Sequence, residues 1–263
     1  MFAMVRRGGK PPRRDPPSHP PPTTTFQRHD GDVTLHVQAA TQRLLHTVDR
    51  LPDSAWSGPS HCTGWSRAHV IAHLALNAEA LAGVLRGFRD GVPTTMYRSD
   101  EARDQDIDDL VAVAGTSPAA VRERLRTAVA AFADVVAVAD GLPKEATFER
   151  TPGGRVVPGR AVPFLRLREV EIHHADLDAG YTASDWPPDN AMSFLSNDAR
   201  QYRGPGFHAV ATDEPARWTF GETDATSPTV SGPLGALAWW ATGRDPGSVL
   251  SSTNGTLPTM EGR

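Results

Sequence analysis

Residues 64–78 read GWSRAHVIAHLALNA and contain the pattern that decides the predicted fold. Ser66 is a good helix N-cap, and the apolar residues after it recur at intervals of three and four, which is typical of one buried face of a helix. We therefore predict a helix from Ser66 to about Asp90. It carries His69 and His73, which are four residues apart and so project from the same face.

A second periodic helix is predicted at residues 162–177, and it contains the sequence RLREVEIHHADL. Glu169 and His173 are four residues apart in it, a spacing that suits two ligands of one ion. Spacing alone leaves open the choice between this pair and the neighbouring pair Glu171 and His174. Because adjacent helix residues point about 100° apart, only one of the two histidines can face the interior of a helical bundle.

Two more long helices are predicted from apolar periodicity, at residues 32–51 and 118–141, and a short one follows Ser99. Four long amphipathic helices with connections of varied length indicate an antiparallel bundle over residues 30–180. Within that span, residues 146–160 have the composition of a hairpin or an irregular excursion.

The pattern changes after residue 186, where short strands and helices are predicted in place of long helices. The predicted elements are a helix at 189–202, strands at 207–212 and 216–220, a helix at 233–242 and a strand at 249–252. This order is typical of a small α+β domain. We therefore predict a mainly α protein with a Pro/Arg-rich tail at 1–29, a helical bundle at 30–182 and an α+β domain at 183–263.

The charge distribution excludes some classes of function. The formal net charge is −4, but residues 1–26 hold five basic residues and one acidic residue and are rich in proline, as in a disordered extension. The remaining chain is acidic, which argues against a nucleic-acid-binding protein. No run of about 18 apolar residues predicts a membrane span, and no signal peptide is recognisable, so we expect a cytoplasmic protein without membrane contact.

The histidine and carboxylate pairs predict a metal site. Two ligands from one helix and a third from the facing helix would give a three-ligand site with open positions, which is the catalytic rather than the structural pattern. Two imidazoles and a carboxylate suit Zn²⁺ and also accept Fe²⁺, Ni²⁺ or Mn²⁺. Cys62 is the only cysteine, so a thiolate cluster and an internal disulfide are excluded, and we expect it to pack rather than react.

Residues 64–78 resemble the first signature of the mycothiol-dependent maleylpyruvate isomerase family, a branch of the DinB-like metal-binding four-helix bundles. Residues 166–177, followed by Gly180-Tyr181, resemble its second signature. Residues 231–233 and 239–244 are similar to a stretch of its sterol-carrier-like C-terminal domain. The resemblance runs in sequence order over about residues 30–258.

The resemblance implies that His73, Glu169 and His173 are the metal ligands. It also implies that Arg103 and Arg244 line the active site as catalytic residues, with Arg244 also binding the thiol cofactor. The other members of the two pairs, His69, Glu171 and His174, then belong to the surroundings of the site or to the surface. His69 is the one most expected to influence a ligand, because it lies one turn before His73.

The resemblance further implies mycothiol as cofactor or cosubstrate, a divalent metal ion, most simply Zn²⁺, and a small electrophile as substrate. A free thiol is mostly protonated at neutral pH, whereas coordination to a dication deprotonates it. The thiolate would then either isomerise maleylpyruvate from cis to trans or be transferred to the substrate. A non-catalytic small-molecule-binding protein is the alternative from another class, and the oligomeric state is left open between monomer and homodimer.

Overall fold

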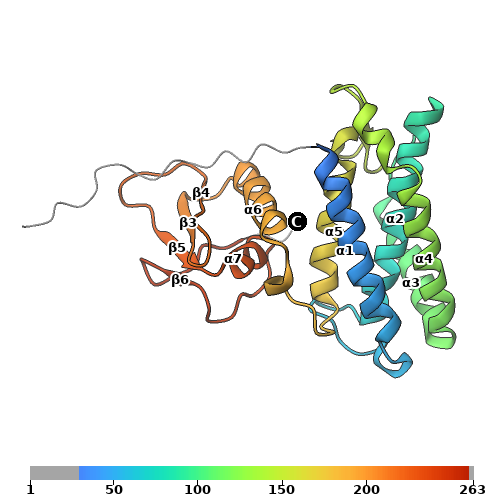
Figure 1. The fold of residues 1–263 in the computed structure, drawn as a ribbon, viewed down its shortest axis with the longest axis horizontal. Helices are drawn as coiled ribbons and strands as arrows, with labels where there is room; N and C mark the ends of the chain where they lie inside the picture. The colour runs from blue at the N-terminus through green and yellow to red at the C-terminus, as the bar shows by residue number, and fades with distance from the viewer. Residues whose placement is uncertain (1–29, 261–263) are drawn as a thin grey trace, which may run out of the picture.

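The computed structural model describes residues 30–260, so the predicted basic tail lies outside the described residues. Five helices form an elongated bundle on one side of the molecule (Figure 1). They are α1 (Asp30–Arg50), α2 (Arg67–Asp90), α3 (Asp100–Thr116), α4 (Pro118–Ala133) and α5 (Val162–Asp176). The bundle confirms the prediction for this half of the chain, although α3 is a full helix of 17 residues rather than a short one.

Local sequence signals explain where these helices begin and end. The capping box of α2 pairs Ser66 with His69, and Gly91 ends the helix in the left-handed region at φ 69°. The Ser99 side chain accepts a hydrogen bond from the amide of Ala102 at the start of α3. His69 is therefore a capping residue of α2, which is a role that its spacing to His73 did not reveal.

The helix predicted for residues 118–141 is wrong in its last third. The α-helix ends at Ala133, and Val136–Gly141 forms a 3-10 helix instead. Val135 has φ −122° and ψ −6°, outside the α-helical region. Three of residues 135–138 are valines, and the α-helix ends just before them. Valine is β-branched and has a lower helix propensity than unbranched residues.

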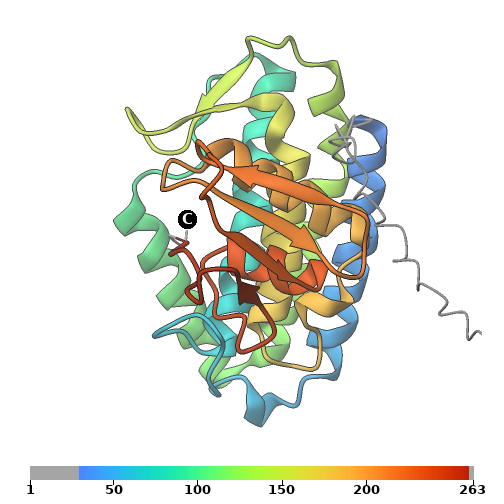
Figure 2. The same ribbon diagram turned by 90° about the vertical axis from the view of Figure 1, so that its left-hand side faces the viewer.

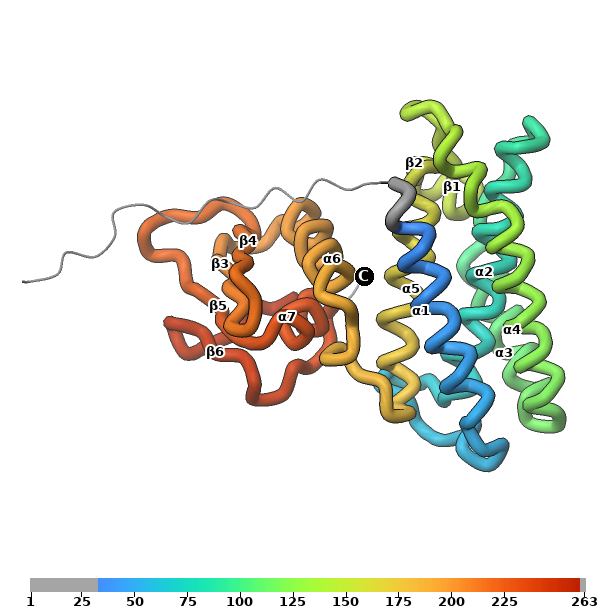
Figure 3. The backbone as a smooth tube through the Cα atoms, viewed as in Figure 1, coloured from blue at the N-terminus to red at the C-terminus, as the bar shows by residue number. Residues whose placement is uncertain are grey.

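α2 is the central helix of the bundle and packs against α3, α4 and α5, while α1 packs against α5 (Figure 3). By length and mean hydropathy α2 also qualifies as a membrane span, but 72% of the qualifying window is buried inside the protein. Of the two alternatives predicted for residues 146–160, the hairpin is correct: β1 (Thr147–Glu149) pairs with β2 (Val156–Pro158) at one end of the bundle (Figure 3). The core includes Ala40, Leu44, Ile71, Leu74, Leu81, Leu125, Leu167 and Val170.

The C-terminal part is a small α+β unit, as predicted. Its sheet has the order β4-β3-β5-β6, and two helices cover the sheet face that looks toward the bundle (Figures 1 and 2). The elements are α6 (Pro188–Gln201), β3 (Phe207–Ala211), β4 (Arg217–Phe220), β5 (Thr229–Gly232), α7 (Leu234–Ala241) and β6 (Ser251–Ser252).

The sequence prediction missed β5, which pairs in parallel with β3. Its four residues contain one large apolar side chain, Val230, so they carry too little periodicity to be recognised. The prediction of the last strand at 249–252 is correct only for Ser251 and Ser252.

A buried polar network joins the two parts at α5. Glu171 is fully buried and accepts hydrogen bonds from Arg43 of α1 at 2.7 Å, Asn190 of α6 at 2.7 Å and Tyr181 at 2.6 Å. Because α5 contacts both the bundle and the C-terminal unit, a site carried by α5 lies close to their junction.

Candidate metal centre

The structure brings His73 of α2 together with Glu169 and His173 of α5. Their ligand atoms all lie within 4.8 Å of one another. Glu169 Oε2 lies 2.7 Å from His73 Nε2 and 3.4 Å from His173 Nε2, and the two imidazole centroids are 4.7 Å apart. Of the alternatives that spacing left open, these are the three residues that converge.

The residues that spacing could not exclude lie elsewhere. His69 Nδ1 lies 3.2 Å from the Ser66 amide at the N-terminus of α2. His174 is buried on another face of α5, where its Nε2 is 2.7 Å from Thr47 Oγ1. His69 therefore caps a helix, whereas His174 and Glu171 hold neighbouring elements together at the junction.

Asp176 fixes the orientation of His173. Its Oδ2 lies 2.8 Å from His173 Nδ1, and Arg244 donates from Nη2 to the same oxygen at 2.6 Å and from Nε to Oδ1 at 3.2 Å. Burial favours the neutral acid, but the bonds from His173 and Arg244 outweigh it and lower the pKa of Asp176 to about 2. The ring nitrogen Nδ1 therefore donates to a carboxylate, which leaves Nε2 facing Glu169, as in metal-ligating histidines.

The charges of the three converging residues suit a cation. Burial lowers the pKa of His73, so its imidazole is neutral, as a ligand must be. Burial opposes ionisation of Glu169, yet hydrogen bonds with both histidines hold its pKa well below the usual value. For His173, bonds to Asp176, Cys62 and Glu169 overcome burial and raise its pKa well above the usual value. Carboxylates thus lie at both ring nitrogens of His173, Asp176 at Nδ1 and Glu169 at Nε2, and on the Nε2 side a cation could replace the proton.

A second cluster, Cys62, His173 and Asp176, also has ligand atoms within 4.8 Å. Asp176 already makes a bidentate ion pair with Arg244, which places a fixed positive charge beside any ion held there. Cys62 Sγ is 3.9 Å from His173 Nδ1, the nitrogen that is already bonded to Asp176. The set around Glu169 is therefore the better cation site.

Arg103 lies beside the cluster, in α3. It forms an ion pair with Asp104 at 2.5 Å, and its charge contributes to the lowered pKa of His73. With Tyr97 and Met96 it lines a cavity of about 250 Å³. Its guanidinium is thus near the ligands and next to open space.

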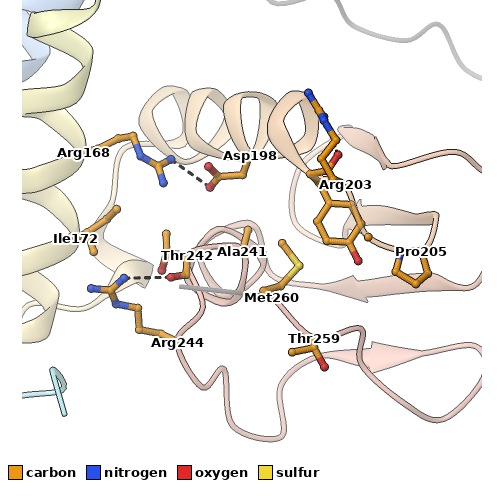
Figure 4. Close-up of a pocket in the computed structure, with 12 residues that line it drawn as sticks. Arg168, Ile172, Asp198, Arg203, Pro205, Ala241, Thr242, Arg244, Thr259 and Met260 are labelled. Carbon is orange, nitrogen blue, oxygen red and sulfur yellow. Dashed lines mark hydrogen bonds and ion pairs between the residues drawn. The ribbon is translucent and has the colours of Figure 1, made fainter. Parts of the chain in front are cut away.

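Arg244 lies between two larger cavities at the junction. One, of about 440 Å³, is lined by Arg168 and Ile172 of α5, by Arg244, whose guanidinium lies beside Ile172, and by Met260 farther from α5 (Figure 4). The other, of about 780 Å³, is lined by Cys62 and by Trp239, whose ring is 5.6 Å from the Arg244 guanidinium carbon. Trp239 is therefore a cavity wall, whereas Trp240 is buried in the core.

Sequence reasoning missed Asp176, although it lies within the motif RLREVEIHHADL. Its signal is the spacing of three residues from His173, which places a carboxylate on the same helical face as the predicted ligand. Asp176 contacts a predicted ligand and is not itself one, so the spacing between ligands does not identify it.

Comparison with known proteins is consistent with this geometry. The family model of the mycothiol maleylpyruvate isomerase N-terminal domain matches residues 37–178, more than half of the chain. The chain belongs to this family. The match contains α2 and α5, and so includes all three converging residues. No curated protein sequence matches significantly.

Solved structures extend the similarity to the C-terminal unit. The crystal structure of a mycothiol-dependent maleylpyruvate isomerase has a TM-score of 0.77 and 25% identity, covering 90% of this chain and 98% of that one. A histidine-to-alanine mutant of such an isomerase gives a TM-score of 0.76 with the same identity and coverage. The predicted fold class, a DinB-like helical bundle followed by a small α+β unit, is confirmed, and these relatives are enzymes.

Proposed function

We propose that this protein is a mycothiol-dependent maleylpyruvate isomerase that uses a divalent ion, most simply Zn²⁺, held by His73, Glu169 and His173. The observation that carries the proposal is the convergence of two imidazoles and one carboxylate, from two helices, within 4.8 Å. Three protein ligands leave coordination positions for a small molecule, as in catalytic rather than structural sites.

The donor set fits the proposed ion. A neutral His73 and an ionised Glu169 are in the protonation states that ligands require, and His173 needs only to exchange its Nε2 proton for the ion. When bound, the ion would keep a cofactor thiol deprotonated, and hence nucleophilic, at neutral pH.

The surrounding residues have separate roles in this proposal. Asp176 holds the tautomer and the ring plane of His173, and Arg244 holds Asp176 in place and keeps it ionised. The side chain of Glu169 is 33% exposed, so small molecules have access to the cluster. Arg103, from α3, would bind a substrate carboxylate and stabilise developing negative charge.

The cavities at the junction would accommodate the thiol cofactor. Arg244 faces both larger cavities and would contact a polar part of the cofactor, while Trp239 provides an apolar wall. We accordingly propose that residues 30–182 and 183–263 act as two domains with the site between them. A cytoplasmic location is part of the proposal, since low-molecular-weight thiols stay reduced there.

The test is incubation of the purified full chain with Zn²⁺, mycothiol and maleylpyruvate, followed by mass spectrometry of the products. Isomerisation predicts fumarylpyruvate and full recovery of free mycothiol, because the thiol adds to the double bond and is then expelled. A mycothiol adduct as the final product would assign the chain to thiol transfer instead. No turnover, with substrate bound but unchanged, would favour the non-catalytic binding protein.

A further inference from the structure

Arg166 is a buried arginine to which the proposed mechanism assigns no role. It is 1% exposed and lies in α5, one turn before Glu169 and on the same side of the helix. Its Nη1 donates to the Leu74 carbonyl oxygen at 2.9 Å and to Asn77 Oδ1 at 2.7 Å, both in α2. The side chain thus crosses from one ligand-bearing helix to the other, beside His73.

Arg166 differs from the other arginines of α5 and its surroundings in having no carboxylate partner. Arg43, Arg168 and Arg244 each form an ion pair, with Glu171, Asp198 and Asp176 respectively. Within residues 30–260, Arg166 has no such pair, and its Nη2 is buried without a hydrogen-bond partner. Burial lowers its pKa to about 10, against a favourable interaction with Glu169, so the guanidinium still carries its charge at neutral pH.

A buried cation that makes no direct ion pair is costly, because burial removes its hydration without putting a carboxylate in contact with it. Groups of this kind occur where function requires the field that they create. If a dication were bound by His73, Glu169 and His173, the single carboxylate of Glu169 would face two positive charges, that of the ion and that of Arg166. The surplus positive charge would then be balanced by whatever small molecule occupies the open coordination positions.

We propose that Arg166 makes the site selective for anionic ligands, such as a thiolate or a carboxylate, over neutral ones. The proposal rests on the metal site described under the proposed function. Arg166 does not touch the ligand, since it is buried and lines none of the cavities described above. It acts through its charge, from a position fixed by Leu74 and Asn77.

The experiment uses the full chain loaded with Co²⁺, whose visible spectrum reports the coordination of the ion. Two probes are titrated at fixed pH: 2-mercaptoethanol, which binds as a thiolate, and imidazole, which binds as a neutral molecule. Arg166→Met is expected to weaken thiolate binding about tenfold and to leave imidazole binding unchanged, because only the charged ligand interacts with the lost charge. Arg122→Met is the matched control, because Arg122 of α4 also donates to a backbone carbonyl of another helix, that of Val48 in α1, but is paired with Asp53.

Asn77→Asp is the second variant, and it keeps the hydrogen bond to Arg166 while neutralising its charge. It is expected to repeat the selective loss of thiolate binding, even if Arg166→Met fails to fold. Equal weakening of both probes, or no change in either, in a variant with the wild-type Co²⁺ spectrum overturns the proposal. Failure of the wild-type chain to bind Co²⁺ would instead contradict the proposed metal site itself.

Discussion

At the scale of single residues, Asp176 connects the candidate ligand His173 with Arg244. Asp176→Asn is expected to lower Zn²⁺ affinity by about 10- to 100-fold, because an amide cannot both orient the imidazole and pair with the guanidinium. Competition with a chromophoric chelator measures the change. Asp178→Asn is the control, since Asp178 is half-exposed and pairs with Arg67 away from the cluster. Equal losses in both variants would show that Asp176 has no special role.

The two arginines that the sequence singled out have different surroundings. Arg103→Met is expected to leave Zn²⁺ affinity intact and to lower kcat/KM by about tenfold or more, because the contact with the substrate carboxylate is lost. Arg244→Met is expected to lower both quantities, because Asp176 loses its partner. Metal titration and steady-state kinetics on the same preparations separate these effects. Unchanged metal affinity in Arg244→Met would contradict the role assigned to the pair with Asp176.

At the scale of elements, α5 combines the site with the attachment of the C-terminal unit. Glu171→Gln is expected to destabilise the protein by about 2 kcal/mol, because Arg43 loses its buried counter-charge and the oxygen that accepts from Tyr181 becomes an NH2 donor. Urea denaturation gives the free energy of unfolding. Glu79→Gln is the control: it breaks the half-exposed pair with Arg124 and should change stability by less than about 1 kcal/mol. A similar small change in both variants would argue against the network at Glu171.

Most helices were predictable because their periodicity and caps agree. Ser66 and Ser99 precede the helices that begin at Arg67 and Asp100, and Pro118 begins the next one. β5 was not predictable, because its pairing with β3 is a contact between segments distant in sequence. The local pattern of apolar residues carries no information about such long-range contacts.

The candidate site was predictable only as a set of alternatives. Spacing along the helix allowed either Glu169 with His173 or the neighbouring pair on the adjacent face. Burial does not separate the two pairs, because α5 is buried on most sides. Glu171 and His174 are as buried as any ligand would be, yet they serve the junction with α1 and α6. The choice depended on the resemblance to a family, and the geometry then brought the chosen residues together.

At the scale of the whole molecule, His174 couples the junction to pH. It is stacked on Tyr181 at 3.8 Å, and burial, with the nearby charge of Arg43, lowers its pKa to about 3. A base with a lowered folded-state pKa binds fewer protons than in the unfolded chain. The contribution of His174 to stability should therefore fall by about 1.4 kcal/mol per pH unit from pH 6.5 toward pH 3.

His174→Gln is expected to flatten this decline, because glutamine can keep a hydrogen bond to Thr47 and does not titrate. The free energy of unfolding, measured by urea denaturation between pH 7 and pH 4, checks the slope. His208→Gln is a suitable control, because His208 is a partly exposed residue of β3 in the outer sheet. Parallel pH curves for wild type and His174→Gln would show that His174 is not responsible.

The central claim of the account is that two helices of the intact protein form one site for a divalent ion. The most direct test is the zinc content of the full chain after equilibrium dialysis against Zn²⁺ at micromolar concentration. The account predicts one ion per chain for the wild type and none for folded His73→Ala or Glu169→Gln. Wild-type protein without zinc, or variants that retain the full amount, would contradict it.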